Sequence, residues 1–212
     1  MKKIAFLLPL MALLLVGCGN NDNGGGGGDG DGDGGGGNNP TYHLVAEYDF
    51  TTNGHTATGT ELTADTAKTL FADSLSDGTD KISSVSDLAK VFDGNSTGGA
   101  YANTSQLIKM GTSSVDGAFT LNLVSGTNIK RVVVSAFDWY KKTEPYPVNT
   151  NSLLVNGDSQ LAPYNEAGTP GDLTYDLATA TDTLAFQADG AGTGGNAFGR
   201  VFLFSIALYS YN

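Results

Sequence analysis

Residues 200–211 read RVFLFSIALYSY, and this stretch decides the fold class. Every second residue from Phe202 to Leu208 is apolar, which is the period of a β-strand with one face buried. Counted in this way, one face carries Phe202, Phe204, Ile206 and Leu208. A strand that ends the chain has to be tied down, so we expect it to pair with the first strand or to lie centrally in a sheet.

Short apolar runs with the same alternation recur along the chain between turn dipeptides, which is typical of antiparallel sheets. Residues 117–124 (GAFTLNLV) predict a strand with Phe119, Leu121 and Leu123 on one face. The longer run 129–139 (IKRVVVSAFDW) predicts a central strand covered on both faces. Asn156-Gly157 is the preferred pair of a type I′ hairpin. Further strands are predicted at 44–50, 153–155, 173–177 and 184–186, with Thr181-Asp182 as the turn between the last two.

Two stretches favour a helix. Residues 64–75 (ADTAKTLFADSL) follow Thr63, a good N-cap, and residues 86–92 (SDLAKVF) precede Asp93-Gly94. Both are too short to be stable alone, so we interpret them as crossovers. The predicted fold is all-β: an antiparallel β-sandwich, jelly-roll-like, with one or two short helices.

The N-terminal residues have the layout of a secretory signal. Lys2 and Lys3 precede an apolar stretch at 4–16, which is too short to span a membrane comfortably. The last two residues of this stretch begin the run LVGC at 15–18. An ordinary signal peptide, or a membrane helix with an incidental cysteine, stays open as the alternative. The run LVGC at 15–18 resembles the lipobox of bacterial lipoproteins, which implies a signal peptide at 1–17 and a lipid on the thiol of Cys18.

Cys18 is the only cysteine, which excludes an intrachain disulfide and a cysteine-rich metal site. Acyl chains contribute about 0.8 kcal/mol per buried methylene, so two or three of them would hold the chain firmly on a membrane. The expected partner is therefore a membrane, reached through the lipid on Cys18. The expected location is extracytoplasmic: the outer face of the cell membrane, or the outer membrane in a Gram-negative cell.

Residues 18–40 form a Gly- and Asp-rich stretch that we predict to be a disordered tether. Its residues 29–34 (DGDGDG) match the first six positions of an EF-hand loop. The twelfth position, which needs a bidentate glutamate, is Pro40, and the glycines on either side cannot form the flanking helices. The stretch is thus interpreted as a stalk before a single β-sandwich domain at 41–212.

Charge excludes one class of partner. The chain has 22 acidic and 11 basic side chains and a formal net charge of −11. An acidic surface repels phosphate backbones, so we expect no nucleic-acid partner.

From about residue 93 to residue 212, the pattern of strands and turns resembles the small jelly-roll domains appended to secreted proteins of Firmicutes and Bacteroidetes. The resemblance rests on residues 105–111 (SQLIKMG), 118–123 (AFTLNL), 130–136 (KRVVVSA), 154–157 (LVNG) and 201–209 (VFLFSIALY). It implies an accessory sandwich related in shape to galactose-binding-like modules. Similarity of fold does not by itself assign a function.

The clearest candidate binding site is the stretch 139–147 (WYKKTEPYP), which leaves the long central strand. Aromatic faces stack on sugar rings and lysines bind hydroxyl groups, so a glycan is the expected ligand. The candidate ligand-binding residues are Trp139, Tyr140, Lys142 and Tyr146. The alternative is that Trp139 covers the end of the core and the tyrosines cover an edge.

A second candidate is a structural Ca²⁺ site at Asp93 and Asn95, in the run DGNSTGG, which a plain Gly-rich turn explains as well. No other cofactor is expected. His43 and His55 lie in no catalytic motif, so the predicted function is a non-enzymatic, lipid-anchored surface module. A structural or adhesive envelope lipoprotein and a hydrolase with a cryptic triad remain as alternatives.

Overall fold

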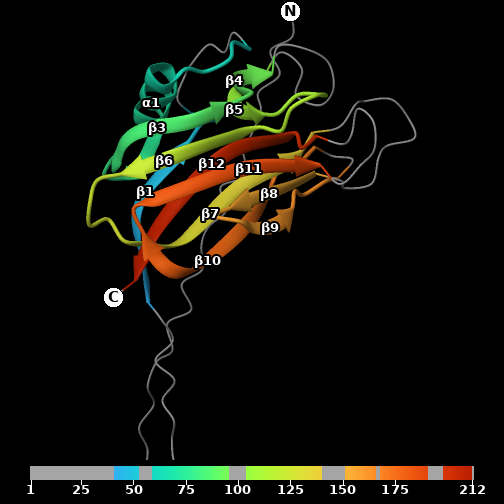
Figure 1. The fold of residues 1–212 in the computed structure, drawn as a ribbon. Coiled ribbons are helices and arrows are strands. Elements are labelled where there is room, and N and C mark those ends of the chain that lie inside the picture. Colours follow the sequence, from blue (N-terminus) through green and yellow to red (C-terminus); the bar gives the residue numbers. More distant parts are fainter. Residues whose placement is uncertain are drawn as a thin grey trace, which may run out of the picture. The chain divides into compact units, whose positions relative to one another are not determined.

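The described part of the domain consists of two antiparallel β-sheets and one short helix (Figure 1). The computed structural model describes residues 41–52, 59–95, 104–139, 151–165, 168–190 and 198–211, with the backbone alone at 95 and 104–106. Residues 39–212 form one compact unit. The predicted all-β sandwich is therefore confirmed, whereas the predicted signal peptide, Cys18 and tether lie outside the described residues.

The helix and strands follow one another along the chain with these bounds: β1 Tyr42–Asp49, α1 Ala64–Asp73, β2 Leu75–Gly78, β3 Ile82–Ala89, β4 Val91–Asn95, β5 Thr104–Met110, β6 Ala118–Leu123, β7 Ile129–Asp138, β8 Asn151–Val155, β9 Asp158–Leu161, β10 Gly171–Thr181, β11 Thr183–Gly190 and β12 Val201–Tyr211.

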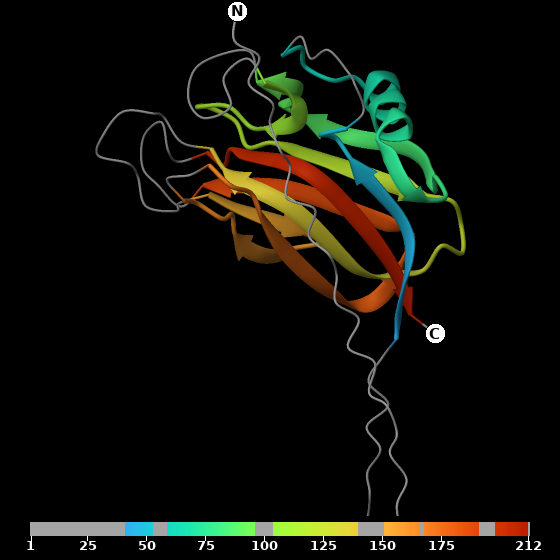
Figure 2. The same cartoon turned by 180° about the vertical axis from the view of Figure 1, so that it is seen from behind.

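Strand order shows how the sheets are connected. One sheet has seven strands in the order β10-β7-β12-β1-β2, with β5 beside β12 and β4 beside β5. The other has five strands in the order β3-β6-β11-β8-β9. From β5 onward the chain crosses repeatedly from one sheet to the other, as Figures 1 and 2 show from opposite sides. Repeated crossing between two antiparallel sheets is the arrangement of a jelly-roll-like sandwich.

Strand β12 is central, and both expectations for it are confirmed. It pairs with β7 along one side, and along the other with β5 and then with β1. The predicted common face is wrong, however, because the register shifts between Leu203 and Ser205. This bulge at Phe204 changes the phase of the strand. Val201 and Leu203 therefore share the main core with Ile206 and Leu208, while Phe202 and Phe204 belong to a second cluster.

The main core lies between the sheets. At its centre the rings of Phe119 and Phe186 stack with centroids 4.7 Å apart, and Phe71 of α1 lies 5.9 Å from Phe119. The predicted first helix is confirmed: Thr63 is its N-cap and forms a capping box with Thr66. The helix buries Ala67, Leu70 and Phe71 against this core.

The predicted second helix, at 86–92, is wrong. These residues end β3 and begin β4. Asp87 and Lys90 have φ values of 52° and 48°, which a right-handed helix does not allow. The register of β3 on β6 also shifts between Ser86 and Ala89, so the irregularity belongs to a strand edge.

The remaining strand predictions agree with the structure in detail at most points. Strand β6 buries Phe119, Leu121 and Leu123 on one face, as expected. Asn156 and Gly157 have φ values of 50° and 85° in the β8–β9 hairpin. Strand β7 alternates from Arg131 to Ser135 and is buried on both faces only over its last three residues, so the prediction of two covered faces holds for that end alone.

Candidate ligand-binding site at the Trp139 end

The predicted site lies at one end of the sandwich, where β7 ends, β8 begins and β12 begins. Asp138 of β7 pairs in register with Val201 of β12, and at the opposite end of β12 Tyr211 pairs with Tyr42 of β1. Because β12 has 11 residues, the two ends are about 30 Å apart. The described domain therefore begins at the end of the sheet remote from Trp139.

Asn151 connects the three strand ends. Its side-chain Nδ2 donates to Asp138 Oδ1 and, at 3.3 Å, to the carbonyl oxygen of Trp139, and its Oδ1 accepts from the backbone N–H of Arg200 at 3.1 Å. Asp138 is only 2% exposed and Asn151 only 5%. A buried carboxylate needs hydrogen-bond donors to offset its lost hydration, and Asn151 supplies one.

Trp139 is half-buried. Together with Tyr164, it packs against the second hydrophobic cluster, whose buried residues are Leu107, Phe137, Phe202 and Phe204. The guanidinium carbon of Arg200 lies 3.5 Å from the centroid of the indole ring, and the backbone N–H of Trp139 donates to the Arg200 carbonyl at 3.1 Å. This is a close cation–π contact. One face of the indole is therefore occupied, and a sugar ring would have to stack on the other face.

Two basic side chains add positive charge at this end. Burial lowers the pKa of the Arg200 guanidinium, and nearby Asp138 partly opposes that shift. Burial, and then the charge of Arg200, lower the pKa of Lys109, whose Nζ lies 4.7 Å from the centroid of the Phe92 ring. The site thus combines an indole, a guanidinium and an ammonium group, which suit hydroxyl or anionic groups of a ligand.

Of the other predicted binding residues, Tyr140, Lys142 and Tyr146 lie outside the described residues. The predicted Ca²⁺ residue Asp93 lies in β4 and is buried, with its backbone bound to Gly59 and Thr60. The side chain of Asn95 lies outside the description. Within the described ranges, no three His, Cys, Asp or Glu side chains come together as a metal site would require.

Of the two histidines, the structure describes only His43. His43 lies exposed on β1, opposite Ser210 in register, and its side chain has no hydrogen bond to a described residue. His55 lies outside the described residues. In the part of the chain that the structure describes, no helix has the length and apolar character needed to cross a membrane.

Sequence reasoning missed Asn151, Arg200 and Lys109. Asn151 carried a signal, because it occupies the buried phase of β8 together with Leu153 and Val155. A polar residue in an apolar phase predicts a buried hydrogen-bonding group. Its partners were not predictable, since Asp138 and Arg200 are 13 and 49 residues away in sequence.

No protein-family model and no curated protein matches this chain.

Proposed function

We propose that this protein is a lipid-anchored, extracytoplasmic surface lipoprotein whose β-sandwich acts by binding, with a glycan as the ligand of the Trp139 end. The observation that carries the anchor is the run LVGC at 15–18, which follows a basic start and an apolar stretch and ends in the only cysteine. The lipid on Cys18 would hold the chain at a membrane, and residues 41–212 would extend from it.

The distance between the two ends of the sheet supports this arrangement. About 22 residues of Gly-rich coil have a root-mean-square span of about 25 Å and a maximum of about 75 Å. The domain starts at Tyr42, about 30 Å along the sheet from Asp138. An anchor at Cys18 would therefore be joined to the domain at the end of the sheet opposite Asp138.

The choice of a glycan rests on the chemistry of that end. An indole face stacks on the C–H face of a sugar, while Arg200 and Lys109 donate hydrogen bonds to hydroxyl or carboxylate oxygens. The contact of Arg200 with the indole orients both groups together. The same contact, with the packing of Trp139 on the second cluster, favours the alternative of a structural or adhesive lipoprotein.

The anchor is tested by labelling cells with an alkyne analogue of palmitate. We expect the label on the wild-type protein in the membrane fraction, and an unlabelled, uncleaved precursor for Cys18→Ser. Because Cys18 is the only cysteine, no other thiol can take up the label. An unlabelled wild-type protein that is cleaved and released from the membrane would instead indicate an ordinary signal peptide.

The ligand is tested with the full chain on a glycan array, in a polyoxyethylene detergent that has neither a sugar nor a charge. Trp139→Ala should weaken glycan binding about tenfold, which corresponds to about 1.4 kcal/mol of lost stacking and packing. Trp139→Phe should retain part of the affinity, and Tyr209→Phe, on β12 toward its far end, serves as the control. If Trp139→Ala bound glycans as well as the wild-type protein does, or if the wild-type protein bound no glycan on the array, the structural alternative would be favoured.

A further inference from the structure

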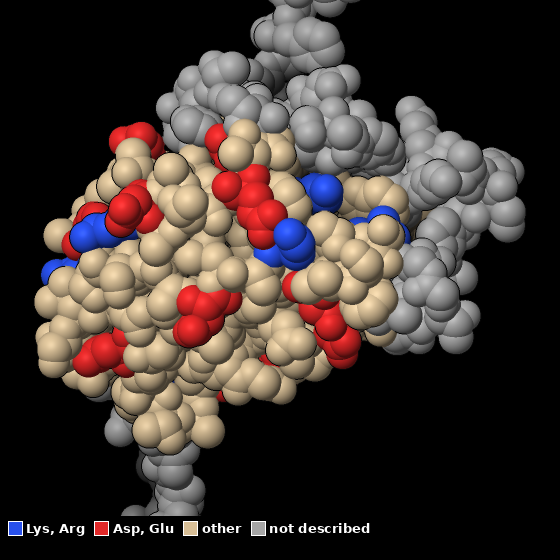
Figure 3. Space-filling view, turned by 45° about the horizontal axis from the view of Figure 1, so that its top comes forward, with Lys and Arg blue, Asp and Glu red and all other residues tan. Residues whose placement is uncertain are grey.

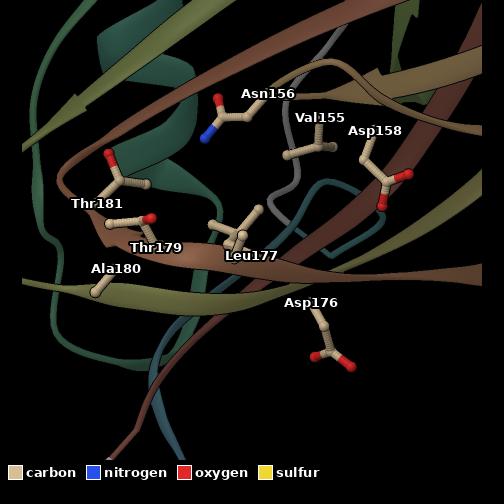
Figure 4. Close-up of a pocket in the computed structure, with 9 residues that line it drawn as sticks. Val155, Asn156, Asp158, Asp176, Leu177, Thr179, Ala180 and Thr181 are labelled. Atoms are coloured by element: carbon tan, nitrogen blue, oxygen red, sulfur yellow. The ribbon is translucent and has the colours of Figure 1, made fainter.

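A groove of about 550 Å³ lies between β10, at the edge of the seven-stranded sheet, and the β8–β9 hairpin of the other sheet (Figure 4). It is separate from the Trp139 end: Asn156 and Asp158 of the hairpin form one wall, and residues 176–181 of β10 form the other. Its volume lies in the range of small-molecule sites.

An insertion in β10 creates this wall. Asp176 pairs with Arg131 and Thr181 with Ile129, so five steps along β10 correspond to two along β7. Three extra residues therefore leave the ladder between these pairs. The Nζ of Lys130 donates to the carbonyl oxygens of Leu177 and Ala178, at 2.8 and 2.7 Å, and holds this bulge in place. Large bulges of this kind commonly re-aim side chains next to functional sites.

Hydrogen bonds brace the groove on both sides. Next to it, Gln160 Nε2 donates to the carbonyl oxygen of Thr174 at 2.5 Å and joins the two sheet edges. Asn156 is fixed to β11, since its Oδ1 accepts from the N–H of Ala185 at 2.7 Å and its Nδ2 donates to the Thr183 carbonyl at 3.2 Å. The walls are therefore set without a ligand, which lowers the entropic cost of binding one.

The corner between β10 and β11 follows Thr181, the last residue that lines the groove. The carboxylate of Asp182 accepts from the backbone N–H groups of Asn128 and Gly126, both at 2.7 Å, and these bonds lower its pKa. Asp182 is thus an anion that ties this corner to the loop before β7.

The chemistry of the lining is one-sided. Partly buried Leu177 supplies the apolar surface of the floor, with fully buried Val155 beside it, and in Figure 4 both side chains lie between the polar groups of the rim. Asp158 is exposed and has no hydrogen bond or ion pair with any described residue, whereas Asp176 is bound by Arg131 at 2.6 and 2.8 Å. None of the lining residues is basic, and the ammonium group of Lys130 behind the β10 wall is bound to the carbonyl oxygens of Leu177 and Ala178. The groove therefore offers one uncompensated carboxylate beside an apolar surface.

We propose that this groove binds a small primary alkylammonium, with the ammonium group on the Asp158 carboxylate and the carbon chain over Leu177. The hydroxyl of Thr179, which also has no hydrogen bond to a described residue, is an acceptor for a second donor on the ligand. The formal net charge of −11 attracts cations, and acidic side chains are spread over the face in Figure 3. This inference requires neither the lipid anchor nor a glycan at Trp139.

The test is an NMR titration of the full, ¹⁵N-labelled chain in the same uncharged detergent. The probe is 1,4-diaminobutane, and the matched control is 1,4-butanediol, which has the same carbon chain without charge. We expect saturable amide shifts at Asn156, Asp158 and residues 177–181 with the diamine, and at least about fivefold weaker binding of the diol, as loss of a charge-assisted hydrogen bond requires. Equal binding of the two, or no saturable shift up to millimolar concentrations, would overturn the proposal.

Three variants locate the site. Asp158→Asn keeps the shape of the side chain and should weaken diamine binding about fivefold or more. Asp87→Asn removes the same charge on β3, where the positive φ suits asparagine, and should leave diamine binding unchanged. Ala180→Lys, at an exposed position of the rim, should block the groove with its own ammonium. Unchanged binding by Asp158→Asn, or equal losses for Asp158→Asn and Asp87→Asn, would refute a site at Asp158.

Discussion

Replacing Asn151 with aspartate is expected to destabilise the domain by about 3 kcal/mol or more at neutral pH. The substitution keeps the size of the side chain but replaces the Nδ2 donor with an anionic oxygen facing Asp138. Both residues are almost fully buried, so the new repulsion is poorly screened. Breaking the partner of a buried charge typically costs about 3–5 kcal/mol.

The loss at Asn151 should depend on pH in a defined direction. Two adjacent buried carboxylates cannot both ionise easily, so one of them binds a proton with a raised pKa in the folded state. Because the folded variant then holds a proton that the unfolded chain has released, its destabilisation should shrink as the pH falls from 7 to 5. Urea unfolding at the two pH values measures this change.

Asn156→Asp is the matched control for Asn151→Asp. Asn156 is exposed, and its substitution removes one donor, to the Thr183 carbonyl, without facing another carboxylate. We expect it to cost about 1 kcal/mol or less. Similar losses in the two variants would mean that Asn151 has no special role in holding Asp138.

Alternation alone predicted a strand correctly wherever polar residues marked its phase. In β6 the apolar residues Phe119, Leu121 and Leu123 are separated by polar Thr120 and Asn122, and the predicted face is the buried one. In β12, residues 201–204 are all apolar, so the sequence contains no mark of the bulge at Phe204. The phase there is set by pairing with β7, which is a tertiary effect.

The helix predictions differ for a similar reason. The start of α1 depends on Thr63 and Thr66, which interact three residues apart, so the signal is local. The conformation at 86–92 depends on the irregular pairing of β3 with β6 and on positive φ at Asp87 and Lys90. At the candidate site, Trp139 could be singled out from the sequence because it is the only tryptophan. Its contact with Arg200 depends on where β7 ends and β12 begins.

The contacts of Gly117 and Gly199 are made with residues far away in the sequence. Asp116-Gly117 reads as a turn dipeptide, and Asp does carry a local preference for turns. In the structure, Asp116 Oδ1 instead accepts from the backbone N–H of Gly199 at 2.5 Å, 83 residues away. The carbonyl of Gly117 accepts from the N–H of Ala188 at 2.8 Å. Both glycines therefore lie where the chain segments before β6, at the end of β11 and before β12 cross at close range.

The second large effect is expected for Gly199→Ala. A Cβ atom at Gly199 would lie 2.1 Å from the backbone nitrogen of Asp189 and 2.3 Å from the carbonyl carbon of Ala188. Both are main-chain atoms of β11, which cannot rotate away as a side chain can, so β11 or β12 has to move. We expect a loss of about 3 kcal/mol or more in the free energy of unfolding, at the upper end for overpacking.

Gly157→Ala separates this steric clash from backbone strain. Gly157 has a φ of 85° in the β8–β9 hairpin, and a Cβ there would meet no atom within 4 Å. For Gly157→Ala the only expected loss in the free energy of unfolding comes from the strain of the left-handed conformation, which is about 1–2 kcal/mol. Urea unfolding of the two variants compares them directly. If Gly199→Ala cost no more than Gly157→Ala, the crossing would have room for a methyl group. The close approach of β11 to the start of β12 would then not be the reason for glycine at position 199.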